Sequence, residues 1–202
     1  MSYTLPFEAK HLSKKIKHTD QVFLIGSCFT EHMTDYLNQA GFDTLSNPHG
    51  ILFNPLSVTK SINSYVNGLH KKEEDLFYLN ELWNSWDHHT RFSHIDKETA
   101  LTEMNASIDK AHTYLKQCDW LVITLGSSFQ YHLVESKYPV ANNHRAPGQW
   151  FEKELLSIIE IQQAADNGVY NKEYKEKAMA DSVVNNALEN EILEYLEPKK
   201  LI

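Results

Sequence analysis

Hydrophobic positions along the chain fall into two patterns, short continuous runs and longer stretches with helical spacing. Residues 21–26 and 120–125 are apolar runs that end in or beside a glycine, which is typical of buried strands. Over residues 29–40 and 97–117, apolar side chains recur at steps of three and four, which predicts helices. Strands that alternate with helices of this length predict an α/β protein with a parallel sheet covered by helices.

Turn and cap residues place most of the remaining elements. Asn54 followed by Pro55 is typical of a helix N-terminus, because asparagine caps the helix and proline suits its first position. In chain order, the further expectations are a strand at 42–45, a helix at 55–69, a strand or ordered loop at 75–94, an edge strand at 138–141, and helices at 151–165 and 172–196.

The C-terminal part differs in character from the rest of the chain. From residue 151 onward it holds 11 acidic and 6 basic residues, no histidine and no clear strand pattern. We expect Leu155, Ile158 and Ile159 to face inward from a helix. This predicts an α/β domain over residues 1–165 and an acidic helical extension of the same domain over residues 166–202.

Composition narrows the class of protein. The 202 residues are 42% hydrophobic and 23% charged, which suits one domain with a proper core. A net charge of −8 without a basic cluster argues against nucleic acid as a partner. No apolar run approaches the ~20 residues of a membrane span, and no signal-peptide layout is present. Two cysteines are too few for a disulfide framework, although one bridge stays open, so we expect a cytoplasmic protein.

Candidate chemistry gathers at the strand ends, where parallel sheets bind their ligands. Ser27 and Cys28 lie between the first strand and the first turn of a helix, where N–H groups stabilise a thiolate or a developing oxyanion. The alternative is that Ser27 caps the helix and Cys28 is a small buried apolar residue. Gly126 and Ser128 follow the second strand in the same way.

A second cluster packs five ionisable side chains into eight residues, Asp87, His88, His89, Arg91 and His94. Such a cluster supplies a general base with an orienting carboxylate, or a metal site. Metal is the weaker alternative, because the spacing matches no zinc pattern and adjacent histidines of an extended segment point to opposite faces. A polar surface loop is the remaining interpretation.

Two turns add weaker candidates. Asn143 and His144 follow the predicted edge strand, and Asn47 and Gly50 belong to an Asn-Pro-His-Gly turn. Their side chains or amide groups could bind an oxyanion or a substrate carbonyl. Asparagine, histidine and glycine are equally common in turns without function.

Several of these segments, in this order, resemble the GSCFA-domain family. The matching segments are 26–29, 47–55, 83–89, 124–126 and 141–144, within about residues 6–160, with Thr30 where the name-giving motif has alanine. The resemblance implies the SGNH (GDSL-type) hydrolase group, with a flavodoxin-like, three-layer α/β/α fold. It also implies ester hydrolysis or acyl transfer through a nucleophile, an oxyanion hole and a late Asp-x-x-His. This scheme requires no cofactor and no metal.

The match to the group's motifs is uneven. When the group's Gly-Asp-Ser-Leu motif is aligned with residues 26–29, Cys28 takes the position of the nucleophile. Shifting the alignment by one residue puts Ser27 at that position but loses the match to the motif's glycine. Gly50 matches the second-block oxyanion glycine loosely, and Ser128 replaces the oxyanion asparagine of the third block. No Asp-x-x-His follows His144. The family's C-terminal part is thus expected to be missing or replaced after about residue 161, leaving the sheet incomplete at that end and an internal histidine as base.

These observations together predict an SGNH-like esterase or acyltransferase acting on a small-molecule or glycan acyl ester. The catalytic candidates are Ser27, Cys28, His88, His89 and His144. The oxyanion or substrate-binding candidates are Asn47, Gly50, Asp87, Gly126, Ser128 and Asn143. The alternative is a non-catalytic ligand-binding or interaction module that has lost its C-terminal base.

Overall fold

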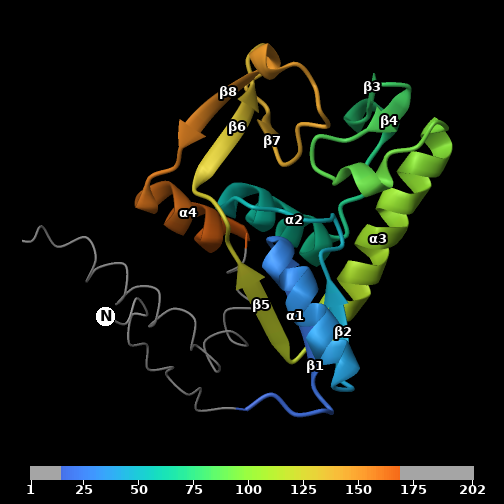
Figure 1. Ribbon diagram of the computed structural model, residues 1–202, viewed down its shortest axis with the longest axis vertical. Helices are drawn as coiled ribbons and strands as arrows, with labels where there is room; N and C mark the ends of the chain where they lie inside the picture. The colour runs from blue at the N-terminus through green and yellow to red at the C-terminus, as the bar shows by residue number, and fades with distance from the viewer. Residues whose placement is uncertain (1–14, 169–202) are drawn as a thin grey trace, which may run out of the picture. The chain divides into compact units, whose positions relative to one another are not determined.

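A three-stranded parallel sheet lies at the centre of the computed structural model, which describes residues 15–168 (Figure 1). Its strands are β1 (Gln21–Gly26), β2 (Asp43–Ser46) and β5 (Trp120–Thr124), in the order β2-β1-β5. Gly26 pairs with Thr124 on one side of β1, and Leu24 pairs with Ser46 on the other. The carboxyl ends of the three strands therefore meet at one edge, and the predicted α/β class with a parallel sheet is confirmed.

Three predicted helices are confirmed, each with the ends that its flanking residues favour. They are α1 (Cys28–Gln39), α2 (Pro55–Asn67) and α3 (Lys97–Gln117). Asn54 caps α2 by accepting a hydrogen bond from Ser57 N at 2.8 Å. Because this cap satisfies a backbone N–H group that the helix itself leaves open, it fixes where α2 begins.

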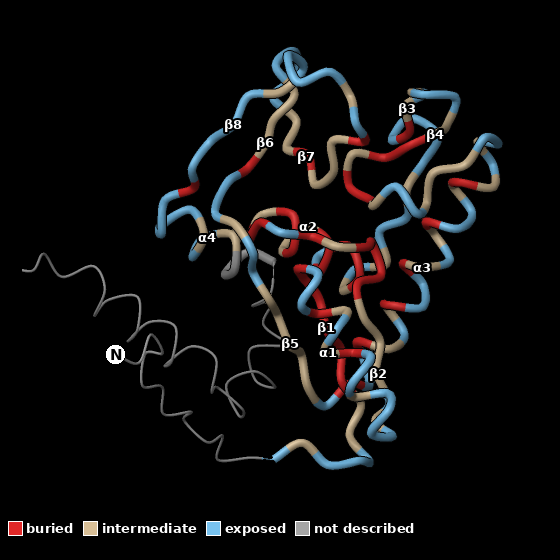
Figure 2. Tube along the Cα trace, in the orientation of Figure 1, coloured by how far each residue is buried: buried red, intermediate tan, exposed pale blue. Residues whose placement is uncertain are grey.

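The core forms where β1, α2 and α3 pack together. Residues 22–25 of β1 are fully buried, as Figure 2 shows in red. Helix α3 buries one residue per turn along a single side. These residues are Ala100, Met104, Ile108, Ala111 and Leu115.

Helix α1 buries polar residues rather than its apolar stripe. Phe29 and Tyr36 are exposed, whereas Thr30 and Thr34 are the buried residues of this helix. The threonines tolerate burial because their hydroxyls are bonded: Thr30 Oγ1 bonds to Thr124 Oγ1, and Thr34 Oγ1 donates to Thr30 O at 2.8 Å. Spacing alone thus predicts this helix but not its buried side.

Residues 73–94 form a hairpin and two short 3₁₀ turns, where the sequence predicts a strand or ordered loop over 75–94. The hairpin joins β3 (Phe77–Leu79) to β4 (Leu82–Asn84), and it lies between η1 (Glu73–Asp75) and η2 (Thr90–Phe92). The backbone of Trp83 also bonds to that of His94, which returns the chain to β4 before α3 begins.

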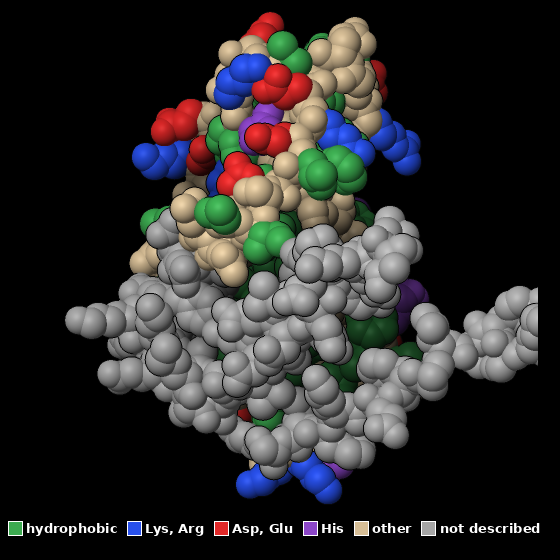
Figure 3. Space-filling model, turned by 90° about the vertical axis from the view of Figure 1, so that its left-hand side faces the viewer, with side chains coloured by type: hydrophobic (Ala, Val, Ile, Leu, Met, Phe, Trp, Pro, Cys, Tyr) green, Lys and Arg blue, Asp and Glu red, His purple; other side chains and the backbone are tan. Residues whose placement is uncertain are grey.

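A second sheet, antiparallel, overturns part of the helix predicted over 151–165. Strand β6 (Phe129–Leu133) lies between β7 (Pro139–Val140) and β8 (Phe151–Leu155), and η3 (Gly148–Trp150) precedes β8. The residues of β8 take strand geometry because all five pair with β6. On the face seen in Figure 3, charged side chains of both signs lie beside apolar ones.

The helix begins later than predicted, as α4 (Ile158–Gly168). Ser157 and Glu160 form a capping box: Ser157 N donates to Glu160 Oε2 at 2.7 Å, and Glu160 N donates to Ser157 Oγ at 3.3 Å. The sequence predicts that Leu155, Ile158 and Ile159 face inward from one helix. All three are exposed: Leu155 is the last residue of β8, and Ile158 and Ile159 lie in the first turn of α4.

The helix predicted over 172–196, and most of the predicted extension from residue 166, lie outside the described residues. Within residues 15–168, no helix has the length and apolar character needed to cross a membrane.

Candidate functional site

The turn between β1 and α1 is held from two sides by hydrogen bonds. Gly26 N donates to Asn47 Oδ1 at 2.8 Å, and Ser27 N donates to Thr124 O at 3.0 Å. Gly26 has a φ of 138°, and a Cβ on it would lie 1.9 Å from Thr124 O. Only glycine fits this position, because any side chain would collide with the backbone of β5.

Ser27 and Cys28 occupy very different surroundings in this turn. Ser27 is buried, and its Oγ lies 3.1 Å from Thr124 Oγ1, which also bonds to Thr30 Oγ1. Although Ser27 is the N-cap residue of α1, its side chain makes no capping bond. Cys28 is a free, exposed thiol at the first position of α1. The interpretation of Cys28 as a buried apolar residue is therefore wrong, and no disulfide joins it to Cys118, which is buried.

The loop after β2 ties this turn to the neighbouring strand. Asn47 N donates to Leu24 O at 3.0 Å, and Asn47 O accepts from Gly50 N at 2.7 Å and from the Arg91 guanidinium. Asn47 Nδ2 is buried without a hydrogen-bond partner. Gly50 has a φ of 90°, and a Cβ there would lie 2.1 Å from His89 Cβ. The loop thus packs directly against the histidine-rich segment.

Gly126 lies beside Ser27, as the meeting of strand ends predicts. A Cβ on Gly126 would lie 3.3 Å from Ser27 Cβ and 3.0 Å from Phe53 Cδ1. Phe53 O accepts hydrogen bonds from Gly126 N at 2.9 Å and Ser127 N at 3.0 Å. The amide groups of Gly126 and Gly50 are therefore engaged inside the protein, so neither is an open oxyanion donor in this structure. Ser128 is exposed.

Asp87 is the centre of a buried ion cluster. Its carboxylate accepts hydrogen bonds from Lys60 Nζ at 2.6 Å, Lys71 Nζ at 2.5 Å and Tyr138 OH at 2.8 Å. Burial by itself would raise the pKa of Asp87, but Lys71 and Lys60 outweigh that effect and lower it. Because these partners occupy both oxygens, Asp87 does not orient a histidine as the sequence suggested.

His88 is fully buried and stacks on His49, with ring centroids 3.9 Å apart. The His49 ring also bonds to the Tyr65 hydroxyl through Nδ1, whereas both ring nitrogens of His88 lack a hydrogen-bond partner. Burial, with a smaller effect of Lys71, lowers the pKa of His49 to about 3. Burial likewise holds the pKa of His88 well below its usual range. The two rings are neutral near pH 7, and His88 is not exposed to a substrate.

His144 is buried as well, and its Nε2 lies 2.7 Å from Ser85 O. Burial lowers its pKa, and the ring packs edge-on against Trp86. Its neighbour Asn143 is partly buried and accepts a backbone bond from Ala146 N at 2.8 Å. In this structure His144 therefore positions its loop against the segment that carries Ser85 and Trp86.

His89 is the candidate histidine that is partly exposed and linked to α1. Its Nδ1 accepts the Arg91 N–H at 3.3 Å. The Arg91 guanidinium in turn pairs with Glu31 Oε1 at 3.3 Å, in the first turn of α1. Burial lowers the pKa of His89, Arg91 lowers it further, and Glu31 opposes them. Cys28 and Glu31 are three residues apart on α1, so they lie on the same face of that helix. Arg91 pairs with Glu31 on that face.

A family model matches most of the chain. The model is that of the GSCFA family, and it covers residues 21–179. The chain belongs to the GSCFA family. No curated protein and no solved structure shows a significant match to it.

In this GSCFA protein the predicted residues form two groups. Ser27, Cys28, Asn47, Gly50 and Gly126 meet at the carboxyl ends of the sheet, and His89 packs against Gly50. The second group lies in the buried clusters around the segment after β4, and it consists of Asp87, His88 and His144.

Sequence reasoning missed four members of these clusters. Nothing in the pattern indicated that Lys60, Lys71 and Tyr138 converge on one carboxylate, since they come from three distant segments. His49 had a signal, because it belongs to the same turn as Asn47 and Gly50.

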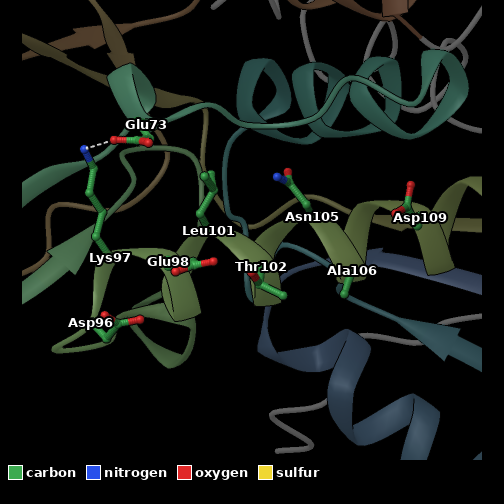
Figure 4. Close-up of a pocket in the computed structure, with 9 residues that line it drawn as sticks. All are labelled: Glu73, Asp96, Lys97, Glu98, Leu101, Thr102, Asn105, Ala106 and Asp109. Atoms are coloured by element: carbon green, nitrogen blue, oxygen red, sulfur yellow. Dashed lines mark hydrogen bonds and ion pairs between the residues drawn. The ribbon is translucent and has the colours of Figure 1, made fainter.

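Two other features of the GSCFA protein do not contribute to this site. Among residues 15–168, no group of three or more His, Cys, Asp or Glu side chains is placed to hold a metal ion. A surface hollow of about 850 Å³ lies along α3 (Figure 4). It is lined by residues such as Glu73, Lys97 and Asp109, and by none of the predicted site residues.

Proposed function

We propose that this GSCFA protein is an acyl-ester hydrolase or acyltransferase with Cys28 as its nucleophile. The observation that carries the proposal is the difference between the two candidate nucleophiles. Cys28 presents an exposed thiol at the N-terminus of α1, whereas Ser27 is buried with its hydroxyl bonded to Thr124. The motif register that preserves Gly26 selects the same residue.

The topology supports an SGNH-like, three-layer architecture. The chain passes from β1 to β2 through α1, and from β2 back across β1 to β5 through α3. Since both crossovers are expected to be right-handed, α1 and α3 cover opposite faces of the sheet. The chain leaves β1 toward β2 on one side, whereas β5 lies on the other side of β1, so the strand order reverses between β1 and β5. Sheets of this kind bind their ligands in the crevice at that point. Cys28 and Gly126 follow those two strands.

In the proposed reaction the Cys28 sulfur attacks the acyl carbonyl carbon, and the bond from that carbon to the alcohol oxygen breaks. The alcohol leaves with a proton, and a thioester remains on Cys28. Water or a second alcohol then attacks the thioester, which releases an acid or a new ester and restores the thiol. A thiol depends less on a base than a serine does, which fits described residues that hold no late Asp-x-x-His after His144.

The first turn of α1 is the element best placed to stabilise negative charge that develops on the carbonyl oxygen. Thr30 N donates to Ser27 O, but the N–H groups of Cys28 and Phe29 have no acceptor within the helix, and the Ser27 side chain does not cap them. His89 suits the same task. Its Nδ1 accepts a backbone N–H, which assigns the proton of the neutral ring to Nε2 and makes that nitrogen a donor. We therefore assign His89 to hydrogen bonding of the substrate rather than to proton abstraction.

The test is hydrolysis of p-nitrophenyl butyrate by the purified protein and matched variants. Cys28→Ala should abolish hydrolysis, Cys118→Ala should leave it unchanged, and Ser27→Ala should retain it if thermal melting shows a folded protein. Mass spectrometry should find a butyryl adduct on Cys28.

Two results would contradict the proposal. Activity that survives Cys28→Ala and disappears in Ser27→Ala would make Ser27 the nucleophile. A folded parent protein without activity and without an adduct would favour the non-catalytic binding module.

A further inference from the structure

An aromatic side chain lies at the strand ends beside the turn that carries Cys28. Phe53 and Ser27 both lie against Gly126, since a Cβ on Gly126 would lie 3.0 Å from Phe53 Cδ1 and 3.3 Å from Ser27 Cβ. Leu52 N donates to Gly26 O at 2.9 Å, and Phe53 O accepts from Gly126 N. The short segment 52–53 therefore connects the ends of β1 and β5, and its aromatic side chain is placed at the turn that carries Cys28.

Three large apolar side chains remain exposed around this turn. Phe29 is 57% exposed, Phe53 46% and Leu125 47%, and they come from α1, the loop after β2 and the end of β5. We call these three residues the apolar collar. Exposed apolar side chains from separate segments that gather at one place indicate a binding surface more than chance does.

The same segments carry no charge. Residues 26–30, 50–59 and 120–129 contain no Asp, Glu, Lys or Arg. Glu31, the first charged residue of α1, is paired with Arg91, and Lys153 Nζ lies over the ring of Phe129. A charged acyl group would therefore find no counter-ion in the collar, whereas a hydrocarbon chain would find two phenyl rings and a leucine.

From these observations we infer that the acyl group carried by Cys28 is an uncharged hydrocarbon chain of four or more carbons, held by Phe29, Phe53 and Leu125. This inference rests on the proposed function, because it names the substrate class of the same thiol. Burying one methylene group of the acyl chain contributes roughly 0.8 kcal/mol, which corresponds to a preference of up to about fourfold for the longer chain. Because the collar is open on one side, we expect a two- to threefold gain per methylene.

The first test does not depend on turnover. N-ethylmaleimide and N-hexylmaleimide add to a thiol by forming one S–C bond, with the thiol proton moving to the neighbouring carbon. The ratio of their rates with Cys28, divided by the same ratio for glutathione, isolates the effect of the protein. Cys118 is buried and is the only other cysteine, so Cys118→Ala removes any remaining background.

We expect this normalised ratio to exceed ten in the parent protein and to fall severalfold in Phe53→Ala. Tyr78→Ala is the matched control, because Tyr78 is also an exposed aromatic residue, on β3. A normalised ratio near one, or one that Phe53→Ala does not change, would overturn the inference.

The second test uses p-nitrophenyl esters from acetate to octanoate. Rising kcat/KM with chain length, lost in Phe53→Ala, supports both proposals. Hydrolysis without a preference for chain length overturns the collar and leaves the proposed function in place. A maleimide preference without hydrolysis of any ester has the opposite meaning: the collar binds hydrocarbon, and the proposed function fails.

Discussion

Acidification from pH 6.5 to 4.5 is expected to destabilise the domain, because His49 and His88 are buried in their neutral forms. A histidine whose pKa is lower in the folded state than in the unfolded state takes up its proton only on unfolding. Its contribution to stability is complete above the unfolded pKa of about 6.5 and falls as the pH drops toward the folded value. For His49 that window runs from 6.5 down to about 3.

The magnitude follows from the width of this window. Each pH unit within it costs about 1.4 kcal/mol per histidine, so two units cost about 2.7 kcal/mol for His49 alone. His88 adds a loss in the same direction, because its pKa is also well below the usual range. A domain of this size has about 5–15 kcal/mol in total, so the loss is a large share of it. Asp87 does not contribute in this range, since its pKa is lowered from a value that is already below 4.

The assay is urea unfolding followed by tryptophan fluorescence at pH 7.0, 6.5, 5.5 and 4.5, at constant ionic strength. His88→Leu is the informative variant, because neither ring nitrogen of His88 has a hydrogen-bond partner to lose. It should cost less than about 1.5 kcal/mol at pH 7 and make the pH dependence shallower. His32→Gln, at an exposed position of α1, is the control and should leave the dependence unchanged. A free energy of unfolding that is flat between pH 6.5 and 4.5 would refute the reasoning.

Two further predictions concern the turn and the ion cluster. Gly26→Ala should destabilise the fold by more than about 3 kcal/mol, because the new Cβ meets Thr124 O and φ is 138°. Thermal melting measures this loss, with Gly148→Ala as the control, because a Cβ on Gly148 meets nothing within 4 Å. Equal melting temperatures for the two variants would contradict the prediction. Asp87→Asn should cost about 2–4 kcal/mol, somewhat less than a fully buried pair, because Lys60 is 40% exposed. Urea unfolding measures that loss, with Glu74→Gln in an exposed pair as control, and a loss below about 0.5 kcal/mol would count against the cluster.

The elements that the sequence predicted well are those whose signal is local. The run 21–26 became β1 because four consecutive apolar residues are buried on both faces of the sheet. Asn54 and Pro55 placed the start of α2 because cap and helix are adjacent in the chain. Residues 151–155 have no such local signal: their strand geometry comes from pairing with β6, whose residues lie 18 to 26 positions earlier in the chain.

In the candidate site, too, the positions that follow from strand topology were predictable from the sequence, and the long-range side-chain contacts were not. Ser27, Cys28 and Gly126 were placed correctly at strand ends, since topology brings the carboxyl ends of parallel strands together. The partners of Asp87 could not be predicted, because Lys60 and Tyr138 are 27 and 51 residues distant and each lysine alone resembles a surface residue. Which of the two nucleophile candidates is accessible also depended on a distant residue, Thr124.

The contact between Ser27 and Thr124 has a consequence for how the chain folds. It joins residues 97 positions apart, and the backbone of the turn bonds to the same threonine. During synthesis from the N-terminus, α1 can form early, but the turn that presents Cys28 lacks its anchor until β5 has emerged and docked beside β1. Cys28, the proposed nucleophile, is thus synthesised well before β5, but its turn is anchored only after β5 has paired with β1.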